Sequence, residues 1–390
     1  MLEADTNTVA TISDTLVNSG EDYFARLERI ISESTSEIHF QTYIFQYDAT
    51  GIKIIEALKK AALRDVKIYL LLDGFGSYAM PSSVIKNLKE SGIHFRFFSP
   101  LFSANTFYIG RRLHHKVVVV DKRKVLIGGI NIADKYYGNS TLIPWLDFAV
   151  ELNNEKIGEK IQEICSAIYN KKSWQNRKKN NLIYDFYDGK VRISQNDWLI
   201  GKREVHDAYI RALETAKKEI IIVGSYFFPG RKLTQLLKNA TQKNVKVILI
   251  LSGISDIPLL RGASLFFYTE LLNYNMELFE WNKSLLHGKA AIIDEDWTTI
   301  GSFNLNHLSS YGSIEMNLEI DSTEFSKLFK AHLNLIILQC QRITPKILKT
   351  KQPFYIKYTN GIFYWTLRML LIIITYLPYK RFMKSYGNEA

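Results

Sequence analysis

The sequence predicts an α/β protein in which one strand–helix–strand unit occurs twice. Two observations support this prediction: the order of the apolar and amphipathic segments, and a polar motif that recurs at a constant distance. A helical pattern precedes the unit in each half. The predicted helix, strand, helix and strand are 23–32, 38–45, 51–62 and 66–72 in the first half, and 205–217, 220–228, 233–240 and 245–251 in the second. This order favours a right-handed parallel crossover in each half.

The recurring motif is His-x-Lys-x4-Asp, followed by a glycine-containing turn and an asparagine. The first copy is His114, Lys116 and Asp121, followed by Gly128, Gly129 and Asn131, and the second is His287, Lys289 and Asp294, followed by Gly301, Ser302 and Asn304. The offset is the same throughout, since 287 − 114, 294 − 121 and 304 − 131 all equal 173. The sequence therefore predicts a duplicated module with two half-sites.

The residue types of the motif suit phosphate chemistry. Each copy leads into an apolar run, 117–120 or 290–293, of the kind expected for a buried strand. On a strand, the histidine and lysine two positions apart point into one cavity. We expect Gly129 and Ser302 to let backbone N–H groups approach an anion, and Asn131 and Asn304 to donate to it. Two histidines supply a nucleophile and a proton donor, while two lysines neutralise charge without a metal.

Metal-binding and mononucleotide-binding signatures are absent from the sequence. Cys165 and Cys340 lack the Cys-x2-Cys or His-x3-His company of a zinc site, and no Gly-x4-Gly-Lys-Ser/Thr stretch occurs. We expect no metal and no cofactor. The chain has two cysteines, and its segment 1–20 is too polar to be a secretory signal. Both features favour a reducing compartment.

Composition points to an anionic partner without identifying it. The 390-residue chain is 47% hydrophobic and carries a net charge of +11, which nucleic acid and anionic lipid would satisfy equally well. We divide the chain into an N-terminal half (1–170), a basic linker (171–195), a C-terminal half (196–340) and a basic and apolar tail (341–390). The stretch 171–181 (KKSWQNRKKNN) favours a solvated linker over a binding site.

These motifs resemble the phospholipase D superfamily, and their flanks resemble bacterial cardiolipin synthases that lack N-terminal membrane spans. The resemblance covers about 16–338 and rests on the two motifs with 43–45, 73–77, 144–147 and 226–230. It implies two duplicated αβα sandwich domains with a shared active site at their interface. The chain departs from the pattern at Asn306 and Leu308, where many relatives carry Asp and Arg, and at Ser313, where they often carry Asn.

The resemblance also implies a mechanism. One motif histidine forms a phosphohistidine that carries a phosphatidyl group, and the other moves the proton. Phosphatidylglycerol is the expected acceptor, phosphatidylglycerol or phosphatidylethanolamine the donor, and cardiolipin the product. The alternatives are a phospholipase D-type hydrolase, a head-group exchanger such as phosphatidylserine synthase and, less favoured, a nuclease. No nucleic-acid partner is expected.

The same resemblance suggests which carboxylates serve the histidines. We expect the acid downstream of each motif, Asp147 after His114 and Glu315 after His287, to orient that histidine. Asp121 and Asp294 are expected to brace the motif loops rather than to touch substrate.

The tail has its own pattern. Residues 358–379 (YTNGIFYWTLRMLLIIITYLPY) are almost wholly apolar and aromatic, are interrupted by Arg368, and are flanked by lysines. This favours a segment lying in an anionic membrane surface over a full span, with a helix packed on the protein core as the alternative. We therefore expect a peripheral or monotopic enzyme at the cytoplasmic face of the bacterial inner membrane.

Overall fold

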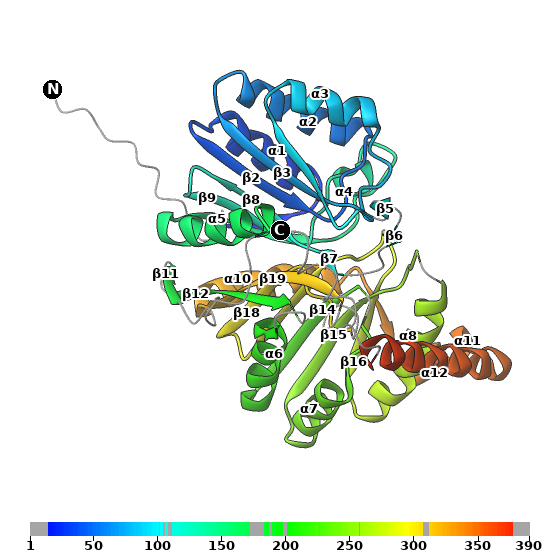
Figure 1. Cartoon of the computed structure of the whole chain (residues 1–390). Helices are drawn as coiled ribbons and strands as arrows, with labels where there is room; N and C mark the ends of the chain where they lie inside the picture. The colour runs from blue at the N-terminus through cyan, green and yellow to red at the C-terminus, as the bar shows by residue number, and fades with distance from the viewer. Residues whose placement is uncertain are drawn as a thin grey trace.

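The structure is a computed structural model. It describes residues 15–100, 102–103, 106–107, 111–171, 183–186, 189–197, 201–225, 227–256, 258–306 and 312–376. These residues form two large β-sheets stacked with helices between them and on their outer faces (Figure 1). A small two-stranded sheet is made of β5 (Phe102–Ser103) and β6 (Thr106–Phe107). The prediction of an α/β fold made of two αβα halves is confirmed.

The N-terminal half contains a seven-stranded sheet of order β1-β10-β9-β8-β2-β3-β4. Its elements are β1 (Leu16–Asn18), α1 (Glu21–Ser32), β2 (Glu37–Thr42), α2 (Ala49–Ala62), β3 (Lys67–Asp73), α3 (Ser82–Glu90), β4 (His94–Phe98), β8 (Lys116–Val120), β9 (Lys124–Gly128), α4 (Asp134–Tyr137), β10 (Phe148–Asn153) and α5 (Glu155–Tyr169). Strands β2, β3 and β4 are parallel, as the predicted crossover requires.

The C-terminal half repeats this plan in a larger sheet of order β11-β12-β19-β18-β17-β14-β15-β16-β20. Its elements are β11 (Ile183–Phe186), β12 (Gly189–Asp197), β13 (Lys202–Arg203), α6 (Glu204–Thr215), β14 (Glu219–Gly224), α7 (Arg231–Gln242), β15 (Lys246–Ser252), α8 (Pro258–Asn273), β16 (Glu277–Trp281), β17 (Lys289–Ile293), β18 (Trp297–Gly301), β19 (Ser313–Asp321), α10 (Thr323–Ile337) and β20 (Gln341–Ile343). Strands β14, β15 and β16 are again parallel.

The predicted linker differs from the structure in its second part. The nine residues of β12 pair along their length with β19, so this strand belongs to the C-terminal sheet. Its alternation of buried residues, including Val191 and Ile193, holds it there despite the basic stretch before it. The C-terminal half therefore begins before residue 196. Residues 172–182 of the predicted linker lie outside the described residues.

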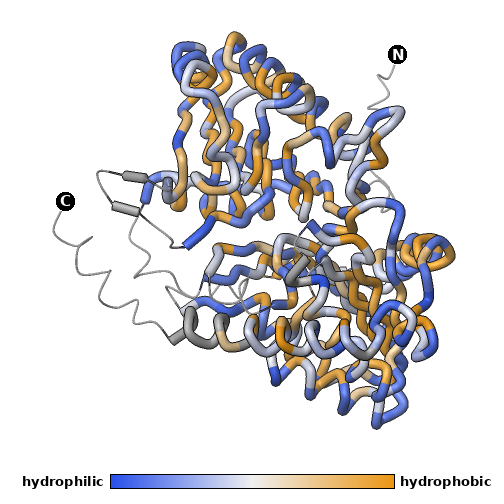
Figure 2. Tube along the Cα trace, turned by 90° about the vertical axis from the view of Figure 1, so that its right-hand side faces the viewer, coloured by the Kyte–Doolittle hydropathy of each residue, from blue (hydrophilic) through white to orange (hydrophobic). Residues whose placement is uncertain are grey.

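The apolar runs of the motif are buried because helices cover both faces of each sheet. Val117 and Val119 of β8 face the central core, into which α5 and α10 also pack, whereas Val118 and Val120 face the outer core under α1 and α2. The central core takes side chains from both sheets and joins the halves. Figure 2 shows hydrophobic residues concentrated along the strands of both sheets. A strand buried on both faces has no polar alternation, which explains the continuous apolar sequence.

The tail forms two helices, α11 (Pro345–Lys351) and α12 (Phe354–Tyr376), and α12 packs against α8 (Figure 1). Tyr364 is buried among aromatic rings, 5.1 Å from Phe228 and 5.2 Å from Phe266 between ring centroids. Within the described part of the chain, no helix is long and apolar enough to cross a membrane. Residues 377–379 of the predicted apolar segment lie outside the described residues.

Candidate active site

Two short backbone crossings bring the half-sites together. The strand just before His114, β7 (Arg112–Leu113), leaves the N-terminal half and pairs in parallel with β19. The His114 amide then donates to the Ile314 carbonyl, at 3.0 Å. In the other half-site, the His287 amide donates to the Leu146 carbonyl, at 2.7 Å. Each motif histidine is therefore fixed by the backbone of the opposite half.

These crossings pair each histidine with the carboxylate of the other half. His114 Nδ1 lies 2.7 Å from Glu315 Oε2, and His287 Nδ1 lies 2.6 Å from Asp147 Oδ2. The expected pairing of each histidine with its own downstream acid is therefore wrong. The backbone pairing explains this result. His114 bonds to Ile314, the residue before Glu315, and His287 bonds to Leu146, the residue before Asp147. Each histidine side chain therefore lies beside the acid that follows its backbone partner.

The two motif lysines lie beside the histidines. Lys116 Nζ donates to the His114 carbonyl at 2.8 Å, and Lys289 Nζ lies 2.8 Å from His287 Nδ1 and also donates to the His287 carbonyl. Burial lowers the pKa of both ammonium groups, well below the usual value for Lys116 and to about 8 for Lys289. A cation that is poorly solvated in the free site gains more from a phosphate than an exposed lysine would.

The electrostatics of the site favour neutral histidines before substrate binds. Burial lowers the pKa of His287 to about 3 and also lowers that of His114, despite the carboxylate beside each ring. Burial alone would raise the pKa of Asp147, but Lys289 and His287 outweigh it and keep the carboxylate ionised. A carboxylate at Nδ1 favours the tautomer with its proton on Nδ1, which leaves the lone pair on Nε2 for a reaction.

The small residues after each motif support the carboxylates rather than a phosphate. Gly129 lies so close to Asp147 that a Cβ atom would be 2.2 Å from its Oδ1. Ser302 Oγ donates to Glu315 Oε2 at 2.6 Å and accepts from the Met316 amide at 3.0 Å. The Gly129 and Ser302 amides donate to strand carbonyls. The expectation that these two residues present donors to phosphate is therefore not met, because both lie at the ends of hydrogen-bonded strands.

The two asparagines are not equivalent. Asn131 is fully buried, where its Oδ1 accepts from the Ile44 amide at 3.0 Å and its Nδ2 donates to the Tyr136 hydroxyl at 2.8 Å. Asn304 is nearly buried, and its Oδ1 has no hydrogen-bond partner among the described residues. Asn304 Oδ1 is therefore open to a hydrogen bond from a donor, such as a substrate hydroxyl, whereas the Asn131 amide is already paired.

The motif aspartates lie at the far ends of their strands and hold loops. Asp121 accepts hydrogen bonds from the Thr35, Ser36 and Glu37 amides, and this set helps to lower its pKa to about 2. Asp294 accepts from the amides of Lys217, Lys218 and Glu219 in the same way. Both aspartates adopt positive φ angles, 51° and 56°, at the turn that follows each motif strand. They brace the structure at a distance from the histidines.

Aromatic residues outside the repeated motif also contact the histidines. The Tyr43 ring packs edge-on against His114 at 5.0 Å, and Lys116 Nζ lies 5.3 Å from the same ring. Tyr136 and Trp145 pack against His287, at 5.3 Å and 6.0 Å. Tyr43 and Trp145 belong to the segments that carry the resemblance, and this was the signal that could have found them.

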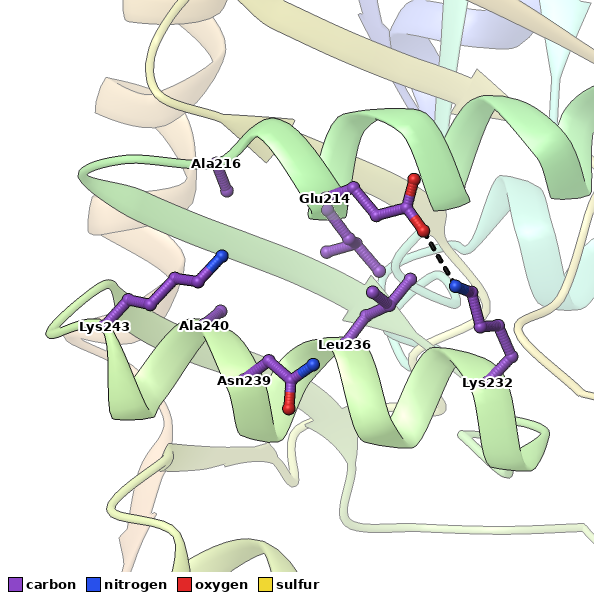
Figure 3. Close-up of a pocket in the computed structure, with 8 residues that line it drawn as sticks. Glu214, Ala216, Lys232, Leu236, Asn239, Ala240 and Lys243 are labelled. Atoms are coloured by element: carbon purple, nitrogen blue, oxygen red, sulfur yellow. Dashed lines mark hydrogen bonds and ion pairs between the residues drawn. The ribbon is translucent and has the colours of Figure 1, made fainter.

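Two further observations delimit the site. Among the described residues, no group of three or more His, Cys, Asp or Glu side chains could hold a metal ion. A cavity of about 240 Å³ lies between α6 and α7, where Lys232 forms an ion pair with Glu214 at 2.8 Å (Figure 3). This cavity contains no residue of the repeated motif, so the candidate active site is the one at the interface of the halves.

This fold, with two histidine–lysine half-sites facing each other across the duplicated domains, defines a phospholipase D-like protein. A family model described as "Cardiolipin synthase, PLD-like domain" matches residues 27–168 and 209–337, which is more than half of the chain. The chain therefore belongs to the cardiolipin synthase family of phospholipase D-like proteins.

Individual relatives and a solved structure agree with this assignment. The chain is 28% identical over 371 residues to cardiolipin synthase B of Escherichia coli (strain K12), covering 93% of this chain and 89% of that one. It is 27% identical over 318 residues to a minor cardiolipin synthase of Bacillus subtilis (strain 168), covering 80% and 78%. In fold it is similar to phosphatidylserine synthase of Haemophilus influenzae Rd KW20, with a TM-score of 0.72, 15% identity, and coverage of 93% and 95%.

Proposed function

We propose that this chain is a phosphatidyltransferase that joins two phosphatidylglycerol molecules into cardiolipin. The observation that carries the proposal is the crossed pairing of His114 with Glu315 and of His287 with Asp147, which gives one site two oriented histidines. The cardiolipin synthase relatives, similar over most of their length, support the choice of product.

The proposed reaction has two displacements. In the first, Nε2 of one histidine attacks phosphorus of the donor lipid, and the bond from phosphorus to the glycerol head-group oxygen breaks. The other histidine, which takes up a proton once the anionic phosphate lies beside it, donates that proton to the leaving oxygen. In the second, a hydroxyl of the acceptor phosphatidylglycerol attacks, the phosphorus–nitrogen bond breaks, and the hydroxyl proton passes to the second histidine. Two phosphatidylglycerols thus give cardiolipin and glycerol, while Lys116 and Lys289 neutralise the phosphate oxygens.

Hydrolysis and head-group exchange are the alternatives on the same site. Water in place of the acceptor would release phosphatidic acid, and another alcohol would give an exchanged lipid. The similarity to phosphatidylserine synthase concerns the fold and does not favour exchange over cardiolipin formation. A nuclease is disfavoured, because the apolar helix α12 on the C-terminal half offers nothing to a nucleic acid.

The experiment that tests this function uses the purified chain with phosphatidylglycerol vesicles. We expect cardiolipin and glycerol in equal amounts, with no loss of activity in EDTA, because the lysines rather than a metal ion neutralise the phosphate oxygens. Supplying phosphatidylethanolamine beside phosphatidylglycerol and measuring released ethanolamine tests the second donor. Phosphatidic acid as the main product would establish the hydrolase instead. Activity lost in EDTA and restored by one divalent ion would contradict the metal-free mechanism.

Helix α12 is the proposed contact with the membrane. Tyr355, Tyr358, Ile362, Trp365 and Met369 are exposed by 50–71%, and their spacing of three and four residues places them along one face of the helix. The opposite face packs on α8. A stripe of aromatic and apolar side chains beside exposed lysines suits the headgroup level of an anionic membrane.

The basic residues support the same surface. Lys346, Lys349 and Lys357 are exposed on α11 and at the start of α12, next to the stripe. Each such lysine contributes about 1 kcal/mol near an anionic surface. A peripheral position on the cytoplasmic face of a bacterial inner membrane would place the site where phosphatidylglycerol is presented.

A further inference from the structure

The proposed reaction brings a second phosphate into the site, because the acceptor phosphatidylglycerol carries its own phosphodiester. The motif lysines do not provide charge for it. Glu315 and Asp147 are the carboxylates that most strongly affect Lys116 and Lys289, so the charge of the two lysines is already opposed before any lipid enters. A site that accepts two phosphodiesters gains from a further cation.

The arginines near His114 do not supply that cation. Arg111 forms an ion pair with Asp197, and Arg112 lies 3.7 Å from Asp73 Oδ1. Both pairs hold the strand that crosses between the halves, since Asp73 Oδ2 also accepts from the Leu113 amide at 2.8 Å. The charges of both arginines are therefore used in ion pairs that position β7.

Among the described residues, Lys135 on α4 is a cation near the site that is not committed in this way. Its ammonium group lies 4.3 Å from the centroid of the Trp145 ring, and that ring packs on His287 at 6.0 Å. The backbone fixes this stack, because the Trp145 amide donates to the Lys135 carbonyl at 2.8 Å. Within the described part of the chain, Lys135 forms no ion pair within 4 Å, although it lies in the field of Asp256, which also acts on Lys289. Burial lowers the pKa of Lys135, so an added anion would be favoured.

Only one of the two repeated halves carries a lysine at this position. The position that matches Lys135 in the second half is Leu308, since 135 + 173 = 308. The half-site of His287 therefore has a nearby lysine that the other half lacks. This asymmetry suits a reaction in which one lipid is the donor and the other is the acceptor.

We propose that Lys135, stacked on Trp145 beside His287, binds the phosphate of the acceptor phosphatidylglycerol. This inference rests on the proposed function and names the residue that selects a phosphate-bearing alcohol over water or a neutral alcohol. Trp145 contacts both the Lys135 ammonium group and the His287 ring, so an acceptor bound at Lys135 would present its glycerol hydroxyl to that histidine. Lys135 is thus a specificity residue for the second displacement.

The test compares two acceptors with one donor. The full chain is given phosphatidylglycerol vesicles with added 1-butanol, and cardiolipin, phosphatidylbutanol and phosphatidic acid are measured together. We expect Lys135→Met to lower the ratio of cardiolipin to phosphatidylbutanol by about tenfold or more, because one charge-assisted contact is lost. Lys135→Arg should retain most of the ratio. Lys53→Met is the matched control, since Lys53 also lies over a ring of this half, Tyr137, but pairs with Glu28.

The outcomes separate the two claims. If the parent chain makes cardiolipin and Lys135→Met leaves the ratio unchanged, or lowers both products alike, the acceptor subsite is refuted and the proposed function stands. If the parent chain makes phosphatidylbutanol and phosphatidic acid but no cardiolipin, both the function and the subsite are overturned. A lower ratio in Lys53→Met as well would assign the effect to general charge rather than to Lys135.

Discussion

At the scale of single residues, the crossed histidine–carboxylate pairs decide what the site can do. His114 and Glu315 are 201 positions apart and His287 and Asp147 are 140 apart, so neither half-site is complete in its own domain. The supporting residues differ in a matched way. Gly129 leaves room for the shorter Asp147, whereas the Ser302 hydroxyl holds the longer Glu315. Each half therefore holds its carboxylate beside a histidine by different packing.

Asp147→Asn tests the crossing directly. The amide keeps the shape of the carboxylate but cannot stabilise a charged ring, so transfer should fall by about 10³–10⁴-fold. Nitrogen NMR of the histidine rings should show a changed tautomer for His287 and an unchanged His114. Glu315→Gln should give the converse, and thermal unfolding checks that both variants fold. A change at His114 in Asp147→Asn would mean that the pairs are not crossed.

His115 gives a prediction about acid stability. Burial lowers the pKa of this fully buried ring to about 3, whereas an unfolded chain binds the proton near pH 6.5. Between those values the unfolded state binds more protons, so the free energy of unfolding falls as the pH falls. His115→Gln removes this contribution and should flatten the fall between about pH 6.5 and 4. Denaturant unfolding at several pH values measures it, with the exposed His94→Gln as control. An unchanged slope in His115→Gln would contradict the buried neutral ring.

At the scale of elements, α12 combines a buried face with an exposed apolar one. Tyr364 and Leu367 are buried in the outer core of the C-terminal half, and Lys351 pairs with the fully buried Glu280 before α12 begins. Deleting the chain from Lys351 onward would therefore damage the core as well as remove a membrane contact. Substitutions on the exposed stripe separate these two effects.

The double substitution Tyr358→Glu and Trp365→Glu should weaken binding to anionic vesicles without lowering thermal stability, because both side chains are exposed by more than half. Binding of the parent chain should also weaken as salt is raised, since exposed charges are screened over about 8 Å at physiological ionic strength. Flotation with phosphatidylglycerol vesicles measures both effects. The matched control is Leu63→Glu, another exposed apolar residue but on the N-terminal half. Equal flotation of the double variant and the parent would place the membrane contact elsewhere.

The elements also show what a sequence can and cannot predict. The paired motifs gave the fold class, the duplication, and the histidine–lysine pairs, because period and register are local properties. The pairing of β7 with β19 could not be predicted from the sequence, since a two-residue strand carries no sequence signal and its partner lies about 200 positions away. The wrong carboxylate pairing follows from that gap, whereas the roles expected for Gly129 and Ser302 failed because their amides pair with neighbouring strands. The nine-residue strand β12 was missed for a different reason, because the basic stretch before it was assigned to a linker that extended to residue 195.

At the scale of the whole molecule, the two halves act as one catalytic unit. The central core draws side chains from both sheets, and each histidine is held by the backbone of the opposite half. Loss of either motif should therefore abolish the reaction rather than halve it. A protein with two independent sites would instead keep about half of its activity when one histidine is replaced.

The most direct test of the central claim is lipid analysis of a bacterium that lacks cardiolipin and expresses this chain. We expect the parent chain to produce cardiolipin, and His114→Ala and His287→Ala each to produce none above background although both proteins accumulate. Cardiolipin formed by either variant at near the parent level would contradict the shared site, and phosphatidic acid in place of cardiolipin in the parent would contradict the transferase.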